Sequence, residues 1–270
     1  MMKKGHQLLA ITALLLATIL VLSVAYARHY AWENNVLADK TQVEIETEQE
    51  KEDTEFIETE NSEVPETEEM EDIVYEFVKS DISYFEDALF IGDSRTIGIK
   101  EYGTFEGAAF FALEGMSIHN LWKKEISVGE LGEITLEDLL KTHQYGKVYV
   151  MLGYNELGYD QTYSAKRYKE ALDRIQELEP EAIIYICSNL HVAEALSSTS
   201  DLYNNININD YNEKLKALAD QKNFFYIEVN TPFDDANGNL PIEYTEDKVH
   251  LYAKYYRQWC EWFCENTIVK

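Results

Sequence analysis

The sequence is poor in cysteine, proline, glycine and basic residues. Its 270 residues include three Cys, four Pro and twelve Gly, and 23 Lys and Arg stand against 50 Asp and Glu. Three cysteines without a CxxC pair argue against a disulfide framework and against a zinc ribbon or finger. So little Gly and Pro excludes a collagen-like or Pro-rich architecture. A formal net charge of −27 repels nucleic acid, so we expect no nucleic-acid partner.

The negative charge is concentrated in one short stretch. Residues 39–72 contain 16 acidic and 2 basic residues, a net of −14, which is about half of the total excess. Their apolar residues are scattered, so this stretch cannot bury enough surface to offset the entropy of the chain. We therefore expect residues 31–72 to be a disordered, extended tether between an N-terminal segment, 1–30, and a folded domain, 73–270.

The N-terminal segment contains a long apolar run. Leu8 to Ala25 is 18 residues without a charge, and Lys3 and Lys4 precede it. Its length suits a single membrane-spanning helix, and the lysines favour a cytoplasmic N-terminus, which would place the domain outside the cytoplasm. The alternative is a signal peptide cleaved at Ala25-Tyr26-Ala27, which would release a secreted protein. We favour the anchor, because the run is longer than an ordinary signal-peptide core of about 7–15 residues.

Residues 73–270 contain short apolar runs that indicate strands. The five runs are Ala88–Gly92, Ala108–Leu113, Lys147–Gly153, Ala182–Cys187 and Phe224–Val229. Continuous rather than alternating apolar runs are typical of strands covered on both faces, as in parallel sheets.

Amphipathic stripes between and after these runs predict helices. They occupy residues 165–179, 211–218 and 251–266, the second with Asn209 or Asp210 as its N-cap. Strands that alternate with helices predict an α/β fold, a three-layer α/β/α sandwich with a central, mainly parallel five-stranded sheet of the flavodoxin-like kind. Ligand sites in such folds lie at the carboxyl ends of the strands.

Two of the strand ends carry candidate reactive or donor groups. Gly92-Asp93-Ser94 follows the first run, where a serine hydroxyl would be exposed at a helix N-terminus that favours negative charge. The same tripeptide is also an ordinary loop and N-cap sequence. Gly115 follows the second run and could present its N–H to a neighbouring atom, or could simply form a turn.

Two further segments supply an amide and a His–carboxylate pair. Asn155, in Gly153-Tyr154-Asn155, could donate to a developing oxyanion or could cap a turn. Asp247 precedes His250 by three residues, close enough to bind its Nδ1–H and leave Nε2 free as a base. A histidine in such a loop can equally be a surface or capping residue.

Taken in order, the four segments resemble the blocks of the SGNH hydrolases, also called the GDSL esterase/lipase family. The resemblance covers roughly residues 80–260. It implies that Ser94 is the nucleophile, His250 the general base and then acid, and Asp247 the residue that orients His250. It further implies an oxyanion hole formed by the N–H groups of Ser94 and Gly115 and the side chain of Asn155. This chemistry requires no metal and no other cofactor, and the sequence shows no metal-binding cluster.

The chain departs from the family pattern at three positions. Arg95 replaces the leucine of GDSL, Glu156 the aspartate of GxND, and Lys248 a glycine that often stands between the Asp and the His. None of these changes removes a catalytic atom, but they leave the substrate preference open. Arg95 and Tyr154 are candidate substrate-binding residues. Arg95 could instead pair with an acidic neighbour, and Tyr154 could instead have a packing role.

Other residues support weaker interpretations. The polar insertion 196–208 could cover a substrate. His119, His143 and His191 have no carboxylate three residues before them. Cys260 and Cys264 lie four apart on one predicted helix, an arrangement that favours core thiols over a disulfide.

The sequence therefore predicts an extracytoplasmic serine esterase tethered to the cell membrane by its N-terminal helix. Its expected substrates are small acyl esters, with acetyl esters of cell-surface or environmental carbohydrate or peptidoglycan as the natural choice. One alternative is an O-acyltransferase that uses the same serine. The other is a catalytically inactive cell-surface binding module, against which the complete Ser94, His250 and Asp247 set argues.

Overall fold

The computed structural model describes residues 75–270. The expected anchor, 1–30, and tether, 31–72, lie outside the described residues, so both stay predictions. Within residues 75–270, no helix combines the length and the apolar character that a membrane span requires.

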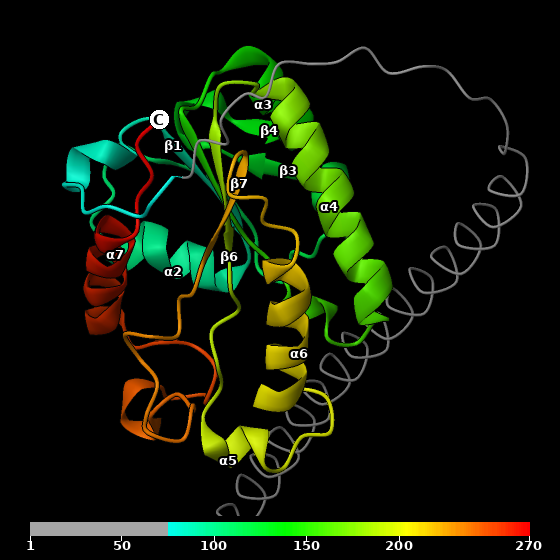
Figure 1. Ribbon diagram of the computed structural model, residues 1–270, viewed down its shortest axis with the longest axis vertical. Coiled ribbons are helices and arrows are strands. Elements are labelled where there is room, and N and C mark those ends of the chain that lie inside the picture. The colour runs from blue at the N-terminus through cyan, green and yellow to red at the C-terminus, as the bar shows by residue number, and fades with distance from the viewer. Residues whose placement is uncertain (1–74) are drawn as a thin grey trace, which may run out of the picture. The chain divides into compact units, whose positions relative to one another are not determined.

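The domain is built on a five-stranded parallel sheet (Figure 1). Its strands are β1 (Ala88–Gly92), β2 (Ala109–Ala112), β5 (Lys147–Met151), β6 (Ile183–Cys187) and β7 (Phe224–Ile227). The strand order is β2-β1-β5-β6-β7, which puts β1 between the two strands whose following loops contain Gly115 and Asn155. All five predicted strands are confirmed, and their carboxyl ends share one edge of the sheet.

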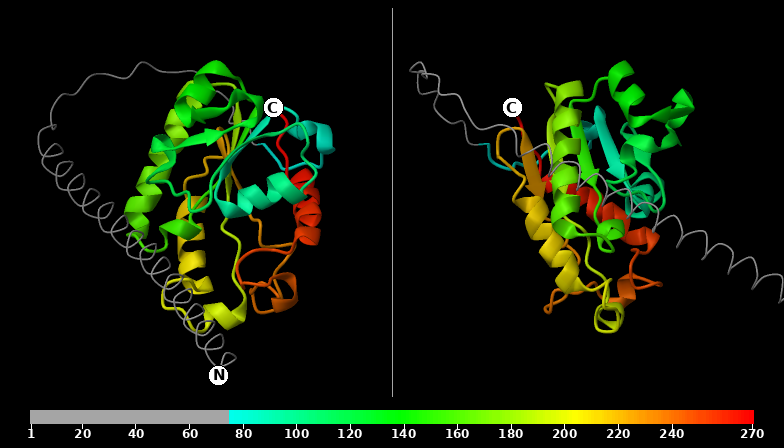
Figure 2. Two further views of the ribbon diagram at one scale, coloured as in Figure 1. Left: turned by 180° about the vertical axis from the view of Figure 1, so that it is seen from behind. Right: turned by 90° about the vertical axis from the view of Figure 1, so that its right-hand side faces the viewer.

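Helices cover both faces of the sheet, so the predicted three-layer sandwich is also confirmed (Figure 2). Two helices, α2 (Ser94–Tyr102) and α7 (Tyr256–Glu265), lie on one face. The opposite face carries α3 (Leu136–Thr142), α4 (Gln161–Leu178) and α6 (Asn205–Lys216), and the short α5 (Glu194–Ser197) precedes α6.

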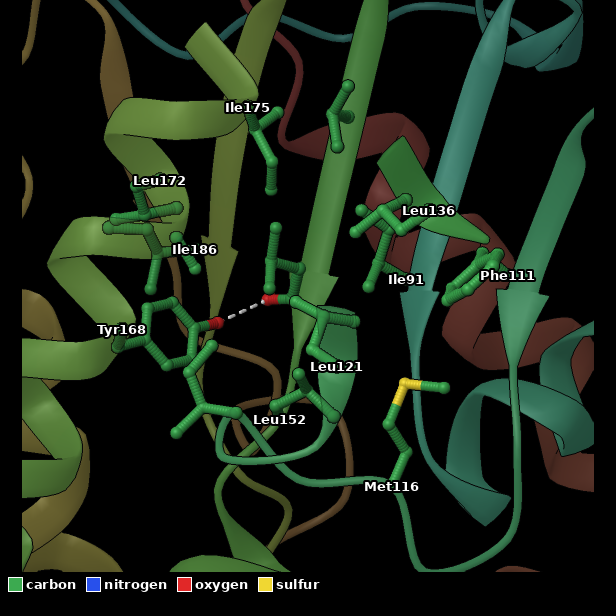
Figure 3. Close-up of a cluster of buried hydrophobic side chains, with 14 of the residues drawn as sticks. Ile91, Phe111, Met116, Leu121, Leu136, Leu152, Tyr168, Leu172, Ile175 and Ile186 are labelled. Atoms are coloured by element: carbon green, nitrogen blue, oxygen red, sulfur yellow. Dashed lines mark hydrogen bonds between the residues drawn. The ribbon is translucent and has the colours of Figure 1, made fainter. Parts of the chain in front are cut away.

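The strands supply alternate residues to two separate hydrophobic cores. Val148 and Val150 of β5 belong to the core under α3, α4 and α6, whereas Tyr149 and Met151 belong to the core under α2 and α7. In the first core, Tyr168 of α4 is fully buried and donates its hydroxyl to the carbonyl oxygen of Val150 at 2.9 Å (Figure 3). Burial on both faces explains why the sequence runs are continuously apolar.

All three predicted helices begin at other residues than expected, and α4 begins at Gln161, four residues before the predicted start. Helix α6 begins at Asn205 with Asn204 as its N-cap, so the proposed caps Asn209 and Asp210 are wrong. Its first turn alternates Asn and Ile, which hides the helical period. Helix α7 begins at Tyr256, because residues 253–255 form a single 3₁₀ turn.

One hairpin and two helices, α3 and the short α5, lie outside the predicted elements. Strands β3 (Glu125–Ser127) and β4 (Glu133–Thr135) pair antiparallel, and α3 follows directly with Thr135 as its N-cap. Strands of three residues are too short to show a period of two.

Candidate active site

Ser94 is presented at the sheet edge by a sharp turn from β1 into α2. Asp93 is the N-cap of α2, and its Oδ1 accepts the N–H of Arg95 at 3.0 Å. Ser94 is the first residue of the helix, so the positive end of the helix dipole lies at its hydroxyl. Gly92 makes the turn possible, because a Cβ at this position would collide with the Oγ1 of Thr96 and the carbonyl oxygen of Met151.

Ser94, His250 and Asp247 form a continuous chain of hydrogen bonds. The Oγ of Ser94 lies 2.8 Å from Nε2 of His250, and Nδ1 of His250 lies 2.6 Å from Oδ2 of Asp247. The structure thus brings together, from the two ends of the domain, the three side chains that the sequence proposed. With Nδ1 protonated toward the carboxylate, Nε2 can accept the proton of the serine hydroxyl.

Asp247 is held as a carboxylate by its own loop. Its Oδ1 accepts the N–H groups of Val249 at 2.9 Å and His250 at 2.8 Å, and the hydroxyl of Thr245 at 3.2 Å. Burial alone would raise the pKa of Asp247, but the hydrogen bonds from His250 and Val249 outweigh burial and hold that pKa well below its usual value. The Asp247 carboxylate therefore stabilises the folded state at pH values above the ordinary aspartate pKa of about 3.9, and this stabilisation is lost as the pH falls.

Lys248, between these two residues, adopts a left-handed backbone conformation. Its φ is +74°, a region that glycine enters more readily than a residue with a Cβ. This geometry explains why a glycine suits the position. The carbonyl oxygen of Lys248 accepts the N–H of Ala193 at 2.9 Å, which ties the loop to the segment after β6.

Asn155 and Gly115 lie on neighbouring loops at the same edge of the sheet. Nδ2 of Asn155 donates to Oδ2 of Asp93 at 3.1 Å and to the carbonyl oxygen of Met116 at 2.9 Å. Gly115 has φ +71°, and nothing lies within 4 Å of the place where a Cβ would stand. The amide of Asn155 thus joins the three loops that follow β1, β2 and β5, and its NH₂ group already has two acceptors in the protein.

Two buried carboxyl groups lie behind this edge. Burial raises the pKa of Asp93, although the charge and the N–H of Arg95 act in the opposite direction. Burial likewise raises the pKa of Glu156 to about 8, against the lowering effect of the Ile118 N–H that its Oε1 accepts. Glu156 is therefore mostly protonated at neutral pH, and it fastens the loop after β2 to the segment after β5.

Arg95 and Tyr154 are stacked next to Ser94. The guanidinium carbon of Arg95 lies 4.4 Å from the centre of the Tyr154 ring, and that ring stacks on Tyr203 at 5.0 Å between centroids. Tyr203 belongs to the insertion 196–208, so this insertion forms a wall beside Tyr154. Arg95 is only 3% exposed. Direct contact of Arg95 or Tyr154 with a substrate stays a prediction.

A shallow hollow lies beside His250. It has a volume of about 280 Å³ and is lined by Tyr102, Glu246, Asp247, His250, Leu251, Tyr252 and Ala253. Tyr102 and Tyr252 are 51% and 41% exposed, so the hollow offers both aromatic surface and carboxylates. The sequence analysis did not point to Tyr102 or Tyr252, because no local pattern marks an exposed tyrosine as part of a site.

A second His–carboxylate pair lies outside the Ser94 chain. Nδ1 of His191 is 2.9 Å from Oδ2 of Asp234, and its Nε2 is 2.8 Å from Oδ1 of Asn209. Burial lowers the pKa of His191, but the hydrogen bonds to Asp234 and Asn209 outweigh burial and raise it. Asp234 is 43 residues away in the chain, so no local spacing could reveal the pair.

Replacing Asn155 with alanine is expected to lower kcat by about 10²-fold with little change in KM. As the predicted oxyanion donor, Asn155 would exchange its contact with Asp93 or Met116 for one with the oxyanion in the transition state, and the loss of one such donor typically costs roughly 10²–10³-fold in rate. Steady-state kinetics on a soluble acetyl ester measure both constants. A change confined to KM would instead identify Asn155 as a substrate-binding residue.

Comparisons with known proteins agree with this arrangement. The model of the GDSL-like Lipase/Acylhydrolase family matches residues 90–258, which is more than half of the chain. A Streptococcus pneumonia protein with "platelet activating factor" in its name shares 19% identity and a TM-score of 0.50, over 67% of this chain and 88% of its own. A GDSL-like lipase from Bacteroides thetaiotaomicron shares 16% identity and a TM-score of 0.50, over 65% of this chain and 84% of its own.

At these identities the two solved structures show the fold alone, and no curated protein sequence matches this one. The family match is independent of them and spans every segment from which the sequence resemblance was drawn. The chain therefore belongs to the GDSL-like lipase/acylhydrolase family, and it is an ester hydrolase.

Proposed function

We propose that this ester hydrolase is a serine esterase that removes small acyl groups, above all acetyl, from carbohydrate at or near the cell surface. The observation that carries the proposal is the hydrogen-bonded chain Ser94–His250–Asp247 at the carboxyl edge of the sheet. In the first step His250 takes the proton of Ser94 while Oγ attacks the ester carbonyl, and it then protonates the leaving alcohol. Water completes the second step with His250 again as base.

The shape of the site favours a small acyl group and a hydrophilic alcohol. The hollow beside His250 is small and lies open to solvent, and two partly exposed tyrosine rings and two carboxyl groups line it. Tyrosine offers a flat apolar face together with a polar tip, which suits a sugar ring. The volume of the hollow, about 280 Å³, is close to the lower end of the roughly 300–1,000 Å³ usual for ligand pockets, so its openness to solvent rather than its volume argues against the burial of a long acyl chain.

Transfer of the acyl group to a sugar hydroxyl is the alternative outcome of the same chemistry. The side chain of His250 is 40% exposed, so a hydroxyl of an acceptor can approach the acyl-enzyme as readily as water does. The two reactions differ only in the nucleophile of the second step.

The test is turnover of an activated acetyl ester with and without an acceptor oligosaccharide. For a hydrolase we expect acetate to be released at the same rate in both cases, with no acetylated oligosaccharide by mass spectrometry. Acetylated acceptor formed at the expense of acetate would show a transferase. An enzyme that cleaves long-chain esters but not acetyl esters would contradict the acetyl assignment.

We further propose that the domain faces outward and remains attached to the cell membrane. The support is the apolar run from Leu8 to Ala25, with Lys3 and Lys4 before it. Protease added to intact cells should then digest the domain, and uncut protein should fractionate with the membrane. Protein found in the medium with Arg28 as its first residue would show cleavage and secretion instead.

A further inference from the structure

Arg95 is a buried cation, and two of the three nitrogen atoms of its guanidinium lack hydrogen-bonding partners. Its Nε and Nη2 atoms are enclosed, and within residues 75–270 neither of them has a hydrogen bond. The part of the chain that the structure describes provides no ion pair for this guanidinium either, although the side chain is only 3% exposed. Burying a charge without a partner is costly, so an unpaired buried arginine is rarely retained without a compensating use.

Two neighbours among the described residues compensate part of this cost: the buried carboxyl group of Asp93, whose ionised form the charge of Arg95 favours, and an aromatic face. The guanidinium carbon lies 4.4 Å from the centre of the Tyr154 ring, a cation–π contact. A cation–π contact leaves the N–H groups of Nε and Nη2 without acceptors and replaces only part of the hydration that the guanidinium loses on burial. The positive charge of Arg95 is therefore held in the protein interior, where the dielectric constant is low, without a direct ion pair.

Arg95 and the Tyr154 ring that it contacts each adjoin, in the sequence, a residue that is expected to donate to the oxyanion. Arg95 directly follows Ser94 in α2, and Tyr154 directly precedes Asn155. Asp93 directly precedes Ser94, and its carboxyl group binds the amide of Asn155. A negative charge at Asp93 opposes the formation of an oxyanion nearby, whereas the guanidinium favours it, and the burial of both side chains weakens the screening of their charges by water.

We propose that Arg95 is a positioning residue that acts through its electric field: its unpaired charge stabilises the negative charge developing on the substrate beside Ser94 and offsets the charge of Asp93. The inference rests on the proposed serine mechanism. It requires no contact between Arg95 and the substrate, which agrees with its burial. It also accounts for the arginine that follows the serine where the family pattern has leucine.

The test is a pair of substitutions at Arg95, assayed on a neutral acetyl ester. Arg95→Met removes the charge and keeps a long apolar side chain, and it should lower kcat by roughly 10–100-fold while KM changes by less than about threefold, since one direct oxyanion donor accounts for about 10²–10³-fold. Arg95→Lys keeps the positive charge but replaces the planar guanidinium with an ammonium group. It should recover most of the kcat that Arg95→Met loses. A boronic acid that forms a tetrahedral anion on Ser94 should lose affinity for Arg95→Met by a similar factor.

Thermal unfolding separates this role from a structural one. Because an unpaired buried charge is removed, Arg95→Met should unfold at the same temperature as the unchanged protein or higher. Arg167→Met is the matched control, since Arg167 pairs with Glu170 at the surface of α4, and it should leave kcat unchanged. If Arg95→Met lowers both kcat and the unfolding temperature, and Arg95→Lys restores neither, then Arg95 only supports the fold.

Two outcomes distinguish this inference from the mechanism on which it rests. If Ser94→Ala abolishes turnover while Arg95→Met retains full kcat, the field of Arg95 has no role and the serine mechanism stands. If Ser94→Ala retains turnover, the mechanism itself is wrong, and the inference about Arg95 falls with it.

Discussion

Replacing Ser94 with alanine is expected to abolish ester hydrolysis, with a fall in kcat of roughly 10⁴-fold or more. The Ser94 hydroxyl lies 2.8 Å from Nε2 of His250, and alanine leaves this base without the nucleophile that it deprotonates. Residual turnover would come from the oxyanion donors and from substrate binding alone. The assay is the release of alcohol from an activated acetyl ester at saturating substrate.

The control for this variant is Ser127→Ala, an exposed serine on β3. It should behave as the unchanged protein does. Circular dichroism and the unfolding temperature of Ser94→Ala should also be unchanged, because a partly buried hydroxyl is lost without creating a large cavity. A folded Ser94→Ala variant with an undiminished rate would end the serine mechanism.

Replacing Asp247 with asparagine is expected to lower kcat by about 10³–10⁴-fold, the second largest effect. The carboxylate accepts the Nδ1–H of His250 at 2.6 Å and so keeps Nε2 free to accept a proton. An asparagine amide can turn its N–H toward Nδ1 instead. His250 would then carry its proton on Nε2, which cannot accept another from Ser94.

The control here is Glu243→Gln, a change in the preceding 3₁₀ turn at an exposed carboxyl, which should leave the rate unchanged. In Asp247→Asn the new side-chain oxygen can still accept the N–H groups of Val249 and His250, so the loop should keep its conformation. A rate within a few-fold of the unchanged protein would show that His250 needs no carboxylate to orient it.

The sheet was predictable because its strands are buried on both faces. Runs such as Val148–Leu152 are continuously apolar, and the spacing between the runs leaves room for crossover helices. The short hairpin of β3 and β4 could not be predicted, because three-residue strands carry too little pattern. The start of α6 was misplaced because its N-cap, Asn204, stands in a run of asparagines that all have the chemistry of a cap.

The reactive groups were predictable to the extent that they follow strands. Ser94 and Asn155 come shortly after β1 and β5, and Asp247 and His250 share one short loop. The pairing of His191 with Asp234 and the enclosure of Arg95 were not predictable, because both depend on which loops meet at the sheet edge. Such contacts are set by tertiary packing and leave no local spacing in the sequence.

The most direct test of the serine mechanism is covalent labelling with an organophosphonate. The reagent reacts preferentially with a serine that a base has activated, and it leaves a stable adduct that peptide mass spectrometry can locate. We expect one adduct per molecule, on the peptide that contains Ser94, with loss of activity in proportion to labelling and no adduct on Ser94→Ala. Complete inactivation with the adduct on another residue, or full activity after Ser94 is labelled, would contradict the mechanism.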